Sequence, residues 1–283
     1  MKISEINIRD PFILEDDGTY YLYGTRAANF GVQTNGFDVY VSNDLENWSE
    51  PILCFDSDAN GMNRGVNWAP EVHKYQGAYY MFATFTRENG LRGTFILRAE
   101  DPKGPFTLHS KGEVTPKEWE CLDGTLYIGK NGQPYLVFCH EHTQIIDGTI
   151  CFLPLSADLT CAAGEAVTLF SASSPSWADK NPEGTHYVTD GPFLYRTKDG
   201  VLLMLWSTFI QGNYAECIVE FIDGEIGTSF RHLDPIITND GGHGMIFRKG
   251  NQLMLTYHSP NQTGKERPVF KEIRDTGVGV ELV

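Results

Sequence analysis

The sequence predicts an all-β fold, a single five-bladed β-propeller over residues 1–283 with four-stranded antiparallel blades around a central funnel. Two observations predict it. A short apolar motif recurs five times, and its copies open with Asp10, Glu71, Asp123, Asp190 and His243. Each copy is followed by a glycine-containing turn and a second apolar run, and the copies are about fifty to seventy residues apart, which suits one blade and its loops.

The repeated hairpins supply the first two strands of each blade, because two short apolar runs around a glycine turn are typical of a β-hairpin. In chain order the pairs are 10–14 with 20–23, 71–75 with 79–82, 123–127 with 135–138, 190–194 with 202–206, and 243–247 with 253–257. Outer strands are expected at 37–42, 94–99, 150–155, 215–221, 267–273 and 278–283. No stretch has a long helical period, so we expect little helix. A β-sandwich fits less well, because its strands would not restart with the same hairpin at these intervals.

Composition narrows the classes of function. The 22 basic and 37 acidic side chains give a net charge of −15, which disfavours nucleic acid and anionic membranes as partners and leaves a neutral ligand such as a sugar. No run approaches the roughly 18 apolar residues of a membrane span. The six cysteines lack CxxC spacing, so we expect buried free thiols. Because residues 1–7 lack the apolar core of a signal peptide, we expect a cytoplasmic protein, although a secreted form with its signal removed would look the same.

The opening residues of the five motifs should meet at one place. In a propeller the first strand of every blade lies beside the central axis, so equivalent residues converge on the funnel. Four acids and one histidine would then lie close together. Like charges brought together raise one another's pKa, which is unfavourable unless the protein uses them. The pattern therefore predicts a catalytic centre.

Five motifs also carry a family resemblance, namely residues 9–13 (RDPFI), 68–71 (WAPE), 122–126 (LDGTL), 189–195 (TDGPFLY) and 242–245 (GHGM). In this order and spacing they resemble glycoside hydrolase family 43, five-bladed propeller enzymes that remove arabinofuranosyl or xylosyl units from plant polysaccharides and oligosaccharides. The resemblance implies an inverting mechanism in which Asp10 is the base, Asp123 raises the pKa of the proton donor and orients it, and Asp190 is the donor. An inverting glycosidase needs such a pair of carboxyl groups, typically about 6.5–9.5 Å apart.

The donor departs from the family pattern. The family usually has a glutamate in a Glu-Gly-Pro motif, whereas this chain has Asp190, one methylene shorter. A misplacement of about 1 Å can cost roughly a hundredfold in rate. Three alternatives follow: the substrate sits deeper and Asp190 still donates, Glu71 or Glu141 donates instead, or the propeller binds carbohydrate without turnover. Because Asp10 and Asp123 are present, we favour an active enzyme.

Other residues are candidates for binding the substrate. Aromatic rings can cover the apolar faces of a sugar, which suggests Phe12, Trp68 and Phe193. Packing within the blades is the alternative for all three, and Trp68 is the best placed for stacking. The resemblance implies that Glu71 contacts sugar hydroxyls or holds the inner strand. Glu141 is a further acid near the site. Trp177 lies in a long loop that could shape the leaving-group side.

Metal binding is expected at most in the axial channel. The resemblance implies that His243 contacts a hydrated calcium ion there, although no cofactor is required for the chemistry; the alternative is a histidine hydrogen-bonded to a carboxylate or to backbone groups. His140 and His142 would point to the same side of a strand, which makes a metal site conceivable without a third ligand in view.

These observations favour an exo-acting, inverting hydrolase that removes terminal α-L-arabinofuranosyl units from a carbohydrate substrate. A β-D-xylosidase or a galactofuranosidase-like enzyme on the same scaffold is the nearest alternative. A carbohydrate-binding propeller that has lost turnover is the alternative from another class.

Overall fold

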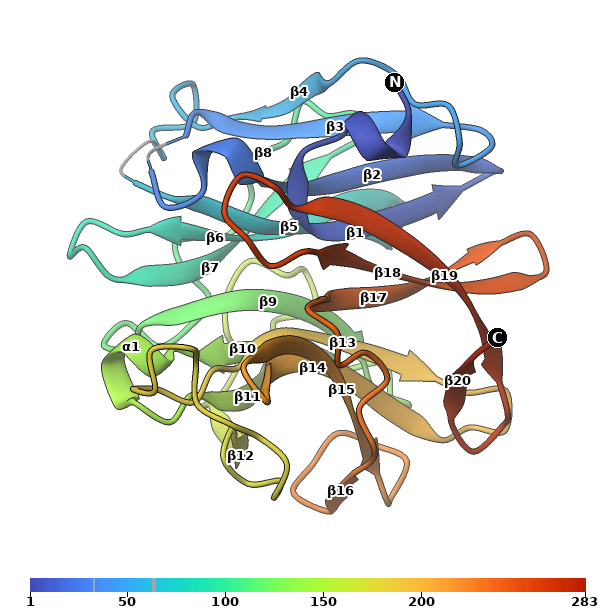
Figure 1. Ribbon diagram of the computed structural model, residues 1–283. Helices are drawn as coiled ribbons and strands as arrows, with labels where there is room; N and C mark the ends of the chain where they lie inside the picture. The colour runs from blue at the N-terminus through green and yellow to red at the C-terminus, as the bar shows by residue number, and fades with distance from the viewer. Residues whose placement is uncertain (33, 63–64) are drawn as a thin grey trace.

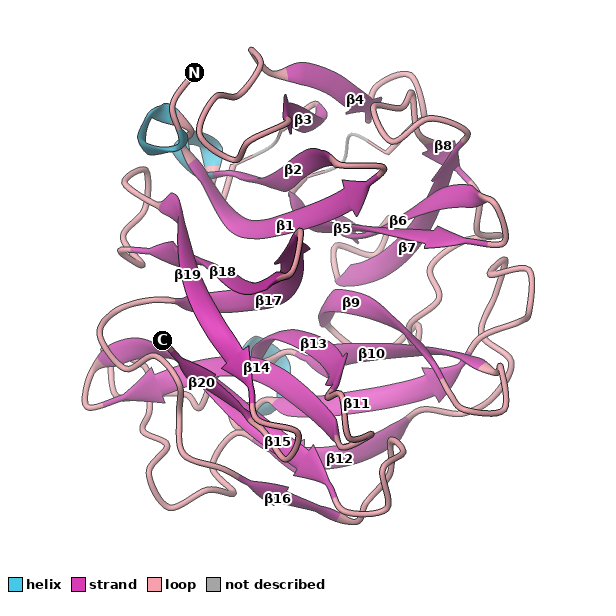
Figure 2. Ribbon diagram, turned by 90° about the vertical axis from the view of Figure 1, so that its right-hand side faces the viewer, coloured by secondary structure: helices cyan, strands magenta, loops and turns pink. Residues whose placement is uncertain are grey.

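The computed structural model describes residues 1–32, 34–62 and 65–283, and these form five four-stranded antiparallel sheets. The sheets surround a common centre, and the first strand of each lies closest to it (Figures 1 and 2). Every sheet uses four strands in chain order, so each blade is one continuous stretch of chain. The expected five-bladed propeller is confirmed.

The strands are assigned to blades as follows. Blade 1 contains β1 (Ile8–Asp16), β2 (Thr19–Arg26), β3 (Gly36–Ser42) and β4 (Ile52–Asp56). Blade 2 contains β5 (Asn67–Tyr75), β6 (Ala78–Thr86), β7 (Arg92–Ala99) and β8 (Thr107–Leu108). Blade 3 contains β9 (Cys121–Ile128), β10 (Pro134–His140), β11 (Thr149–Pro154) and β12 (Val167–Ser171). Blade 4 contains β13 (Asp190–Arg196), β14 (Leu202–Ile210), β15 (Asn213–Phe221) and β16 (Phe230–His232). Blade 5 contains β17 (Gly242–Lys249), β18 (Gln252–Ser259), β19 (Arg267–Asp275) and β20 (Val280–Leu282).

Helices are short, as expected. The described residues form the 3₁₀ helices η1 (Ile3–Glu5) and η2 (Ala27–Asn29) and the four-residue helix α1 (His142–Ile145). Helix α1 begins two residues after β10 ends at His140, so His140 and His142 do not share a strand face. His140 instead stacks on Trp119, with ring centroids 4.3 Å apart, and contacts Gln144 at 2.7 Å. The idea of a paired-histidine metal site on one strand was therefore wrong.

Each first strand contains a β-bulge, where its pairing with the second strand shifts register. Within each bulge one residue has a positive φ: Asp10 (55°), Ala69 (44°), Asp123 (54°), Gly191 (54°) and His243 (54°). For residues other than glycine this backbone costs on the order of 1–3 kcal/mol, and it persists where the surroundings hold it in place, commonly at functional sites. Three of these residues, Asp10, Asp123 and His243, line the cavity described below.

The bulge positions show that aligning the five first strands on Asp10, Glu71, Asp123, Asp190 and His243 gave the wrong register in blades 2 and 4. The residue equivalent to Asp10 is Ala69 in blade 2 and Gly191 in blade 4. Glu71 lies two residues further along β5, and Asp190 lies one residue before the bulge position. In blades 1, 2 and 4 the bulge residue is followed by proline, so alignment on the prolines gives the observed register and alignment on the acids does not.

Neighbouring blades are joined at the bulges. In four blades the backbone N–H of the bulge residue donates to a side chain on the second strand of the preceding blade. The pairs are Ala69 to Thr25 Oγ1 (2.7 Å), Asp123 to Thr84 Oγ1 (3.0 Å), His243 to Ser207 Oγ (2.7 Å) and Asp10 to His258 Nδ1 (3.2 Å). In blade 3 that place on the second strand is taken by Cys139, and the N–H of Gly191 donates to Asp123 Oδ2 at 3.1 Å. These buried hydrogen bonds fix the first strands relative to one another.

The ring closes between blades 5 and 1, where β1 packs against β17, β18 and β19. Nη1 of Arg9 donates to Oε1 of the buried Glu266 at 3.1 Å, and the side chain of Asn7 donates to the carbonyl of Glu266 at 2.8 Å. Because Arg9 directly precedes Asp10, the contacts that close the propeller also position an acid at its axis.

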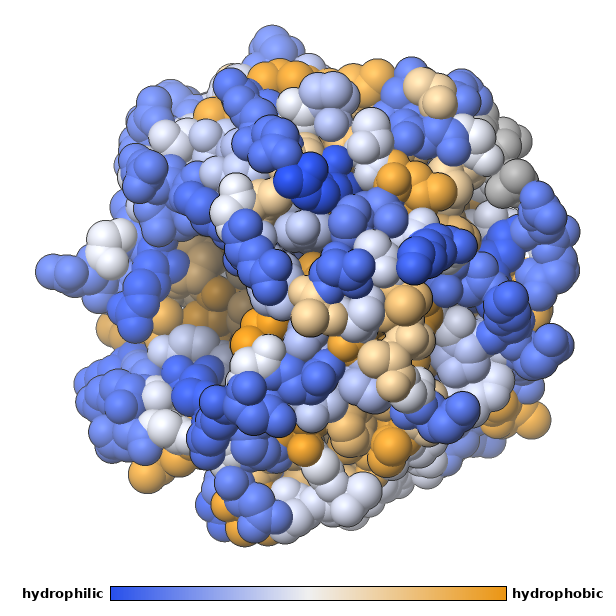
Figure 3. Space-filling view, turned by 180° about the vertical axis from the view of Figure 1, so that it is seen from behind, coloured by the Kyte–Doolittle hydropathy of each residue, from blue (hydrophilic) through white to orange (hydrophobic). Residues whose placement is uncertain are grey.

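Apolar side chains fill the space within and between blades in four buried clusters. All six cysteines are free, as expected; five are buried and Cys161 is partly exposed. In the described part of the chain, no helix is long and apolar enough to cross a membrane. Figure 3 shows one face of the molecule as largely hydrophilic, with a recess that exposes hydrophobic residues.

Candidate active site

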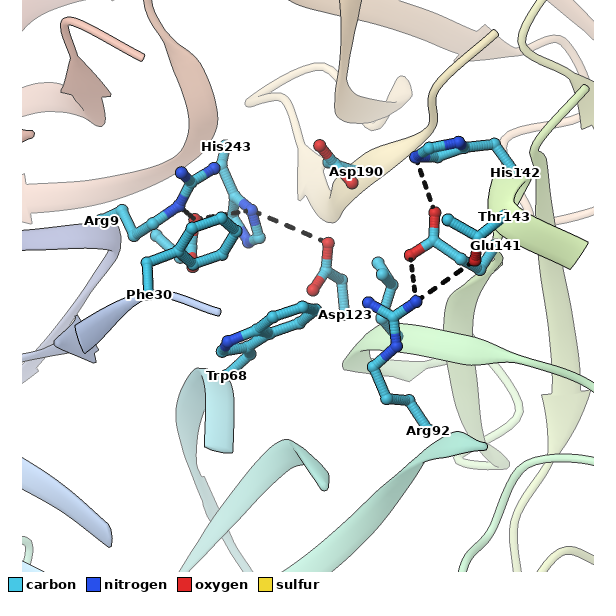
Figure 4. Close-up of a pocket in the computed structure, with 12 residues that line it drawn as sticks. Arg9, Phe30, Trp68, Arg92, Asp123, Glu141, His142, Thr143, Asp190 and His243 are labelled. Atoms are coloured by element: carbon cyan, nitrogen blue, oxygen red, sulfur yellow. Dashed lines mark hydrogen bonds and ion pairs between the residues drawn. The ribbon is translucent and has the colours of Figure 1, made fainter. Parts of the chain in front are cut away.

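A cavity of about 240 Å³, here called the axial cavity, lies where the blades meet (Figure 4). Every blade contributes to its lining, which consists of Arg9, Asp10, Phe30, Trp68, Arg92, Leu122, Asp123, Glu141, His142, Thr143, Asp190 and His243. Six residues expected at the site are therefore brought together: Asp10, Trp68, Asp123, Glu141, Asp190 and His243.

A second cavity of about 370 Å³ adjoins the axial cavity and shares Arg9, Phe30, His142 and Asp190 with it. Its remaining lining comes mostly from loops of blades 3 to 5, namely Asn181, Pro182, Glu183, Val188, Phe209, Gly212, Tyr214, Asp240, Asn261 and Thr263. Asp190 thus lies at the junction of the two cavities, whereas Asp10, Asp123 and His243 line only the first.

Asp10 is held as an anion. Its side chain is 6% exposed, its Oδ2 accepts a hydrogen bond from Thr25 at 2.7 Å, and its Oδ1 lies 3.2 Å from Nδ1 of His243 and 3.5 Å from Nε of Arg9. Burial alone would raise the pKa of Asp10, but the positive charges of His243 and Arg9 outweigh it and lower the pKa to about 2. At neutral pH this carboxylate can accept a proton.

His258 supports Asp10 without being charged. Burial, together with the nearby Arg9, lowers the pKa of His258 to about 3. Its neutral Nδ1 can therefore accept the hydrogen bond from the backbone N–H of Asp10, and its Nε2 faces Asn261 Oδ1 at 3.3 Å. Because His258 is neutral, its Nδ1 does not form an ion pair with Asp10 Oδ1, which lies 3.5 Å away.

His243 lies between two of the acids. Its Nδ1 is 3.2 Å from Asp10 Oδ1 and 3.7 Å from Asp123 Oδ2. Burial would lower the pKa of His243, but the carboxylates of Asp10, Asp123 and Asp190 raise it to about 9. The imidazolium supplies a positive charge that partly balances the three acids.

Asp123 and Asp190 behave as a pair. Burial raises the pKa of Asp123 well above its ordinary value, and the charges of Asp190 and Asp10 add to this against the effect of His243. Burial also raises the pKa of Asp190, with the charge of Glu141 as the next contribution. The pair is therefore expected to retain a proton at a pH where an exposed aspartate would have lost it.

One wall of the axial cavity is a row of cationic and aromatic side chains. The guanidinium of Arg9 lies 4.0 Å from the ring centroid of Phe30, Phe30 stacks on Trp68 with centroids 5.0 Å apart, and the guanidinium of Arg92 lies 4.8 Å from the ring of Trp68. Arg92 also pairs with Glu120 and, at 3.2 Å, with Glu141. Trp68 therefore reaches the cavity as expected, but as one member of a packed wall.

Glu141 is ionised within its own pairs. Its carboxylate lies 2.9 Å from Nε2 of His142 and 3.2 Å from Arg92. Burial would raise the pKa of Glu141, but His142 and Arg92 outweigh this and hold it below its ordinary value. Glu141 is therefore better suited to hold charge beside Asp190 than to donate a proton.

Four residues singled out from the sequence do not line the axial cavity. Glu71 is buried with its carboxylate 3.2 Å from His73. The ring of Phe12 packs on His73 and on Phe193, with centroids 5.2 and 6.3 Å away. Trp177 packs against Trp206 and His232 and lines neither cavity. For Phe12 and Phe193 these contacts match the alternative expectation of packing.

The calcium ion expected beside His243 stays a prediction. Nδ1 of His243 faces the carboxylates of Asp10 and Asp123, which matches the alternative expectation of a histidine held by a carboxylate. Calcium prefers six to eight oxygen ligands, and the described residues contain no group of three or more His, Cys, Asp or Glu side chains arranged to hold a metal ion. No step below therefore relies on a metal.

The charge on His243 predicts a pH effect on stability. The folded-state pKa of about 9 lies above the ordinary value of 6.5, so the stabilisation is fully present below about pH 6.5 and is lost as the pH rises through 9. The variant His243→Gln should lose up to about 3 kcal/mol at neutral pH and should show a shallower fall in stability between pH 7 and 10. Urea unfolding across this range measures both effects, and equal pH dependence of variant and wild type would contradict the assigned charge.

Sequence reasoning missed Arg9, Phe30, Arg92, His142, Tyr214 and His258 at the site. Arg9 had a signal, since it directly precedes an axial acid. Phe30, Arg92 and His142 lie in or beside loops, where no repeating sequence pattern identifies a residue as part of the site. Tyr214 and His258 come from strands whose apolar pattern reads as ordinary packing.

An ionised carboxylate and a proton-holding carboxyl pair that face one cavity are the groups a glycosidase uses to hydrolyse a glycosidic bond. The model of the family described as glycosyl hydrolases family 43 matches residues 3–277. The chain therefore belongs to glycosyl hydrolase family 43.

Known relatives agree with this assignment. The structure of an endo-arabinase from Bacteroides thetaiotaomicron is 38% identical with a TM-score of 0.87, covering 97% of this chain and 96% of that one. An α-L-arabinofuranosidase from Lactobacillus brevis shares the fold at 19% identity and a TM-score of 0.76, covering 95% and 91%. The arabinoxylan arabinofuranohydrolase of Bacillus subtilis is 27% identical over 241 residues, which are 65% of this chain and 46% of that protein. The chain spans less than half the length of the curated relatives it matches.

Proposed function

We propose that this protein is an inverting glycoside hydrolase that removes terminal α-L-arabinofuranosyl units from oligosaccharides or polysaccharides. The observation that carries the proposal is the position of Asp190 at the junction of the two cavities, with Asp10 inside the first only. A proton donor must reach the oxygen that joins the departing sugar to the rest of the substrate, and a base must hold water beyond the anomeric carbon. The terminal sugar then occupies the axial cavity, and the leaving group extends into the second cavity.

The ionised state of Asp10 and the protonated state of Asp190 suit the roles of base and proton donor. The ionised Asp10 takes a proton from water as the water oxygen bonds to the anomeric carbon. Asp190 gives its proton to the glycosidic oxygen as the bond from that oxygen to the anomeric carbon breaks. Burial and the charge of Glu141 help Asp190 to keep its proton, and Asp190 in turn raises the pKa of Asp123, since neighbouring carboxyl groups are costly to ionise together.

An exo mode of action is supported by the small size of the axial cavity, about 240 Å³. Arg92 contacts both Trp68 and Glu141, and these three side chains belong to its lining. A cavity of this size leaves little room for more than the terminal sugar. The proposed glycone is arabinose because the relatives named above include proteins described as an arabinofuranohydrolase and an endo-arabinase.

An endo-acting arabinanase is the second candidate. The relative that is 38% identical is described as an endo-arabinase, and the second cavity of about 370 Å³ can take more than one sugar unit. A β-D-xylosidase or galactofuranosidase-like activity would use the same acids with another glycone.

The test is the product of hydrolysis. With linear α-1,5-linked arabino-oligosaccharides we expect arabinose as the first product, formed as the β-anomer and seen by proton NMR before it equilibrates. Larger fragments as first products would favour the endo mode, and the α-anomer would contradict inversion. Aryl β-D-xyloside and β-D-galactofuranoside substrates serve as controls, because preferential release from either would replace arabinose as the glycone.

A further inference from the structure

We propose that Tyr214 is a positioning residue that fixes the carboxyl group of Asp190 at the junction of the two cavities and so allows an aspartate to serve as proton donor. The inference rests on the proposed function. It concerns how a side chain that is one methylene shorter than glutamate can be held in a productive geometry.

The contact is direct and buried. The phenol of Tyr214 donates to Oδ2 of Asp190 at 2.9 Å, and the tyrosine side chain is only 1% exposed. Both residues belong to blade 4, where β14 lies between β13 and β15. The hydrogen bond therefore spans the inner part of one sheet, which is rigid compared with a loop.

The ring of Tyr214 is itself held in place. It stacks on His258 with centroids 5.4 Å apart and planes inclined by 20°. It also lies against Gly242, where an added Cβ would come within 2.6 Å of Cε1 of the ring. Since His258 also accepts the backbone N–H of Asp10, one packed unit supports both the base and the donor.

The direction of this hydrogen bond decides where the acidic proton is carried. Because Oδ2 of Asp190 accepts the hydrogen bond from the phenol, the proton of the carboxyl group is carried on Oδ1. Fixing one oxygen also removes rotation of the carboxyl group, so that the proton is presented in one direction. A glutamate could find such an orientation through its extra torsion, whereas an aspartate depends on its surroundings.

Several charged or titratable groups face Asp190 from the elements packed around it. They are Glu141 and His142 at the start of α1, His243 on β17, Asp123 on β9, Arg9 on β1 and Tyr214 on β15. Burial and Glu141 raise the pKa of Asp190, while His243, His142 and the hydrogen bond from Tyr214 lower it. Removal of the phenol should therefore raise the pKa of the donor and move the alkaline limb of the rate profile to higher pH.

The experiment compares Tyr214→Phe with wild type on two substrates, methyl α-L-arabinofuranoside and 4-nitrophenyl α-L-arabinofuranoside. The methyl glycoside needs a well-placed acid and the nitrophenyl glycoside does not. We expect kcat to fall by about 10- to 100-fold on the methyl glycoside, by less than about threefold on the nitrophenyl glycoside, and KM to change little. The alkaline limb should move upward in pH.

Tyr195→Phe is the matched control, because Tyr195 also lies in blade 4 and donates to an aspartate, Asp275, at 2.8 Å, but lines neither cavity. The Tyr195→Phe variant should hydrolyse both substrates with the kcat of the wild type. Asp190→Glu gives a second test that keeps the phenol: the longer side chain displaces the carboxyl from Tyr214, and the alkaline limb should again move upward.

The positioning role of Tyr214 would be overturned if Tyr214→Phe lost kcat equally on both substrates. It would also be overturned if the alkaline limb of the rate profile did not move in either Tyr214→Phe or Asp190→Glu. These outcomes differ from failure of the proposed function. If wild type releases arabinose neither from these arabinofuranosides nor from α-1,5-linked arabino-oligosaccharides, the function itself is wrong. An active wild type with an unchanged Tyr214→Phe variant removes only the role of Tyr214.

Discussion

Replacement of Asp10 by asparagine should reduce kcat by a factor on the order of 10²–10⁴ on every arabinofuranoside, with good and poor leaving groups alike. The reason is that Asp10 acts on the attacking water, whose activation does not depend on the leaving group. Asparagine keeps the shape of the side chain and can still accept the hydrogen bond from Thr25, so the cavity should stay intact. Steady-state rates on the methyl and nitrophenyl glycosides measure the effect.

The control for this change is Asp16→Asn. Asp16 lies on the same strand as Asp10, accepts hydrogen bonds from Lys74 and Tyr79, and lines neither cavity. It should leave kcat unaltered. Retention of more than about a tenth of the activity by Asp10→Asn would show that another group activates water. Saturable binding of arabino-oligosaccharides without turnover by the wild type would instead favour the alternative of a carbohydrate-binding propeller.

The fold and the acids at its centre were predictable because both follow from local pattern. Two apolar runs around a glycine turn specify a hairpin, and five such hairpins at regular intervals leave few folds to choose from. Asp10, Asp123 and Asp190 open those hairpins, and the resemblance gave each a distinct role. All three line the axial cavity.

The register of the inner strands was not predictable from the acids alone. A β-bulge adds one residue, and each residue added or removed turns every later side chain to the other face. Glu71 was matched to Asp10 but lies two residues beyond the bulge position, away from the cavity. The proline after the bulge residue was the signal that could have corrected this, since it follows Ala69 as it follows Asp10.

Partners from distant parts of the chain were also beyond sequence reasoning. His258 reaches Asp10 across 248 residues, and Tyr214 reaches Asp190 across a strand that separates them. Such contacts depend on how blades close into a ring. They hold the base and the proton donor in place, which no local pattern in the sequence specifies.

Replacement of Asp190 by asparagine should separate substrates by their leaving groups. On the methyl glycoside we expect kcat to fall by a factor on the order of 10²–10⁴, since the departing alkoxide must be protonated. On the nitrophenyl glycoside the loss should stay within about tenfold, because a nitrophenolate of low pKa leaves without assistance. The alkaline limb of the wild-type profile should also disappear, because the group whose ionisation it reports is gone.

The same pair of substrates distinguishes Asp190 from the other candidate donors. Glu141→Gln and Glu71→Gln should each affect the two glycosides similarly. Glu141 is ionised by its contacts with His142 and Arg92, and Glu71 does not line the axial cavity. A leaving-group effect in Glu141→Gln but not in Asp190→Asn would transfer the donor role to Glu141. The position of Asp190 between the two cavities argues for the opposite result, since the proposed binding mode places the oxygen between the terminal sugar and its leaving group at that junction.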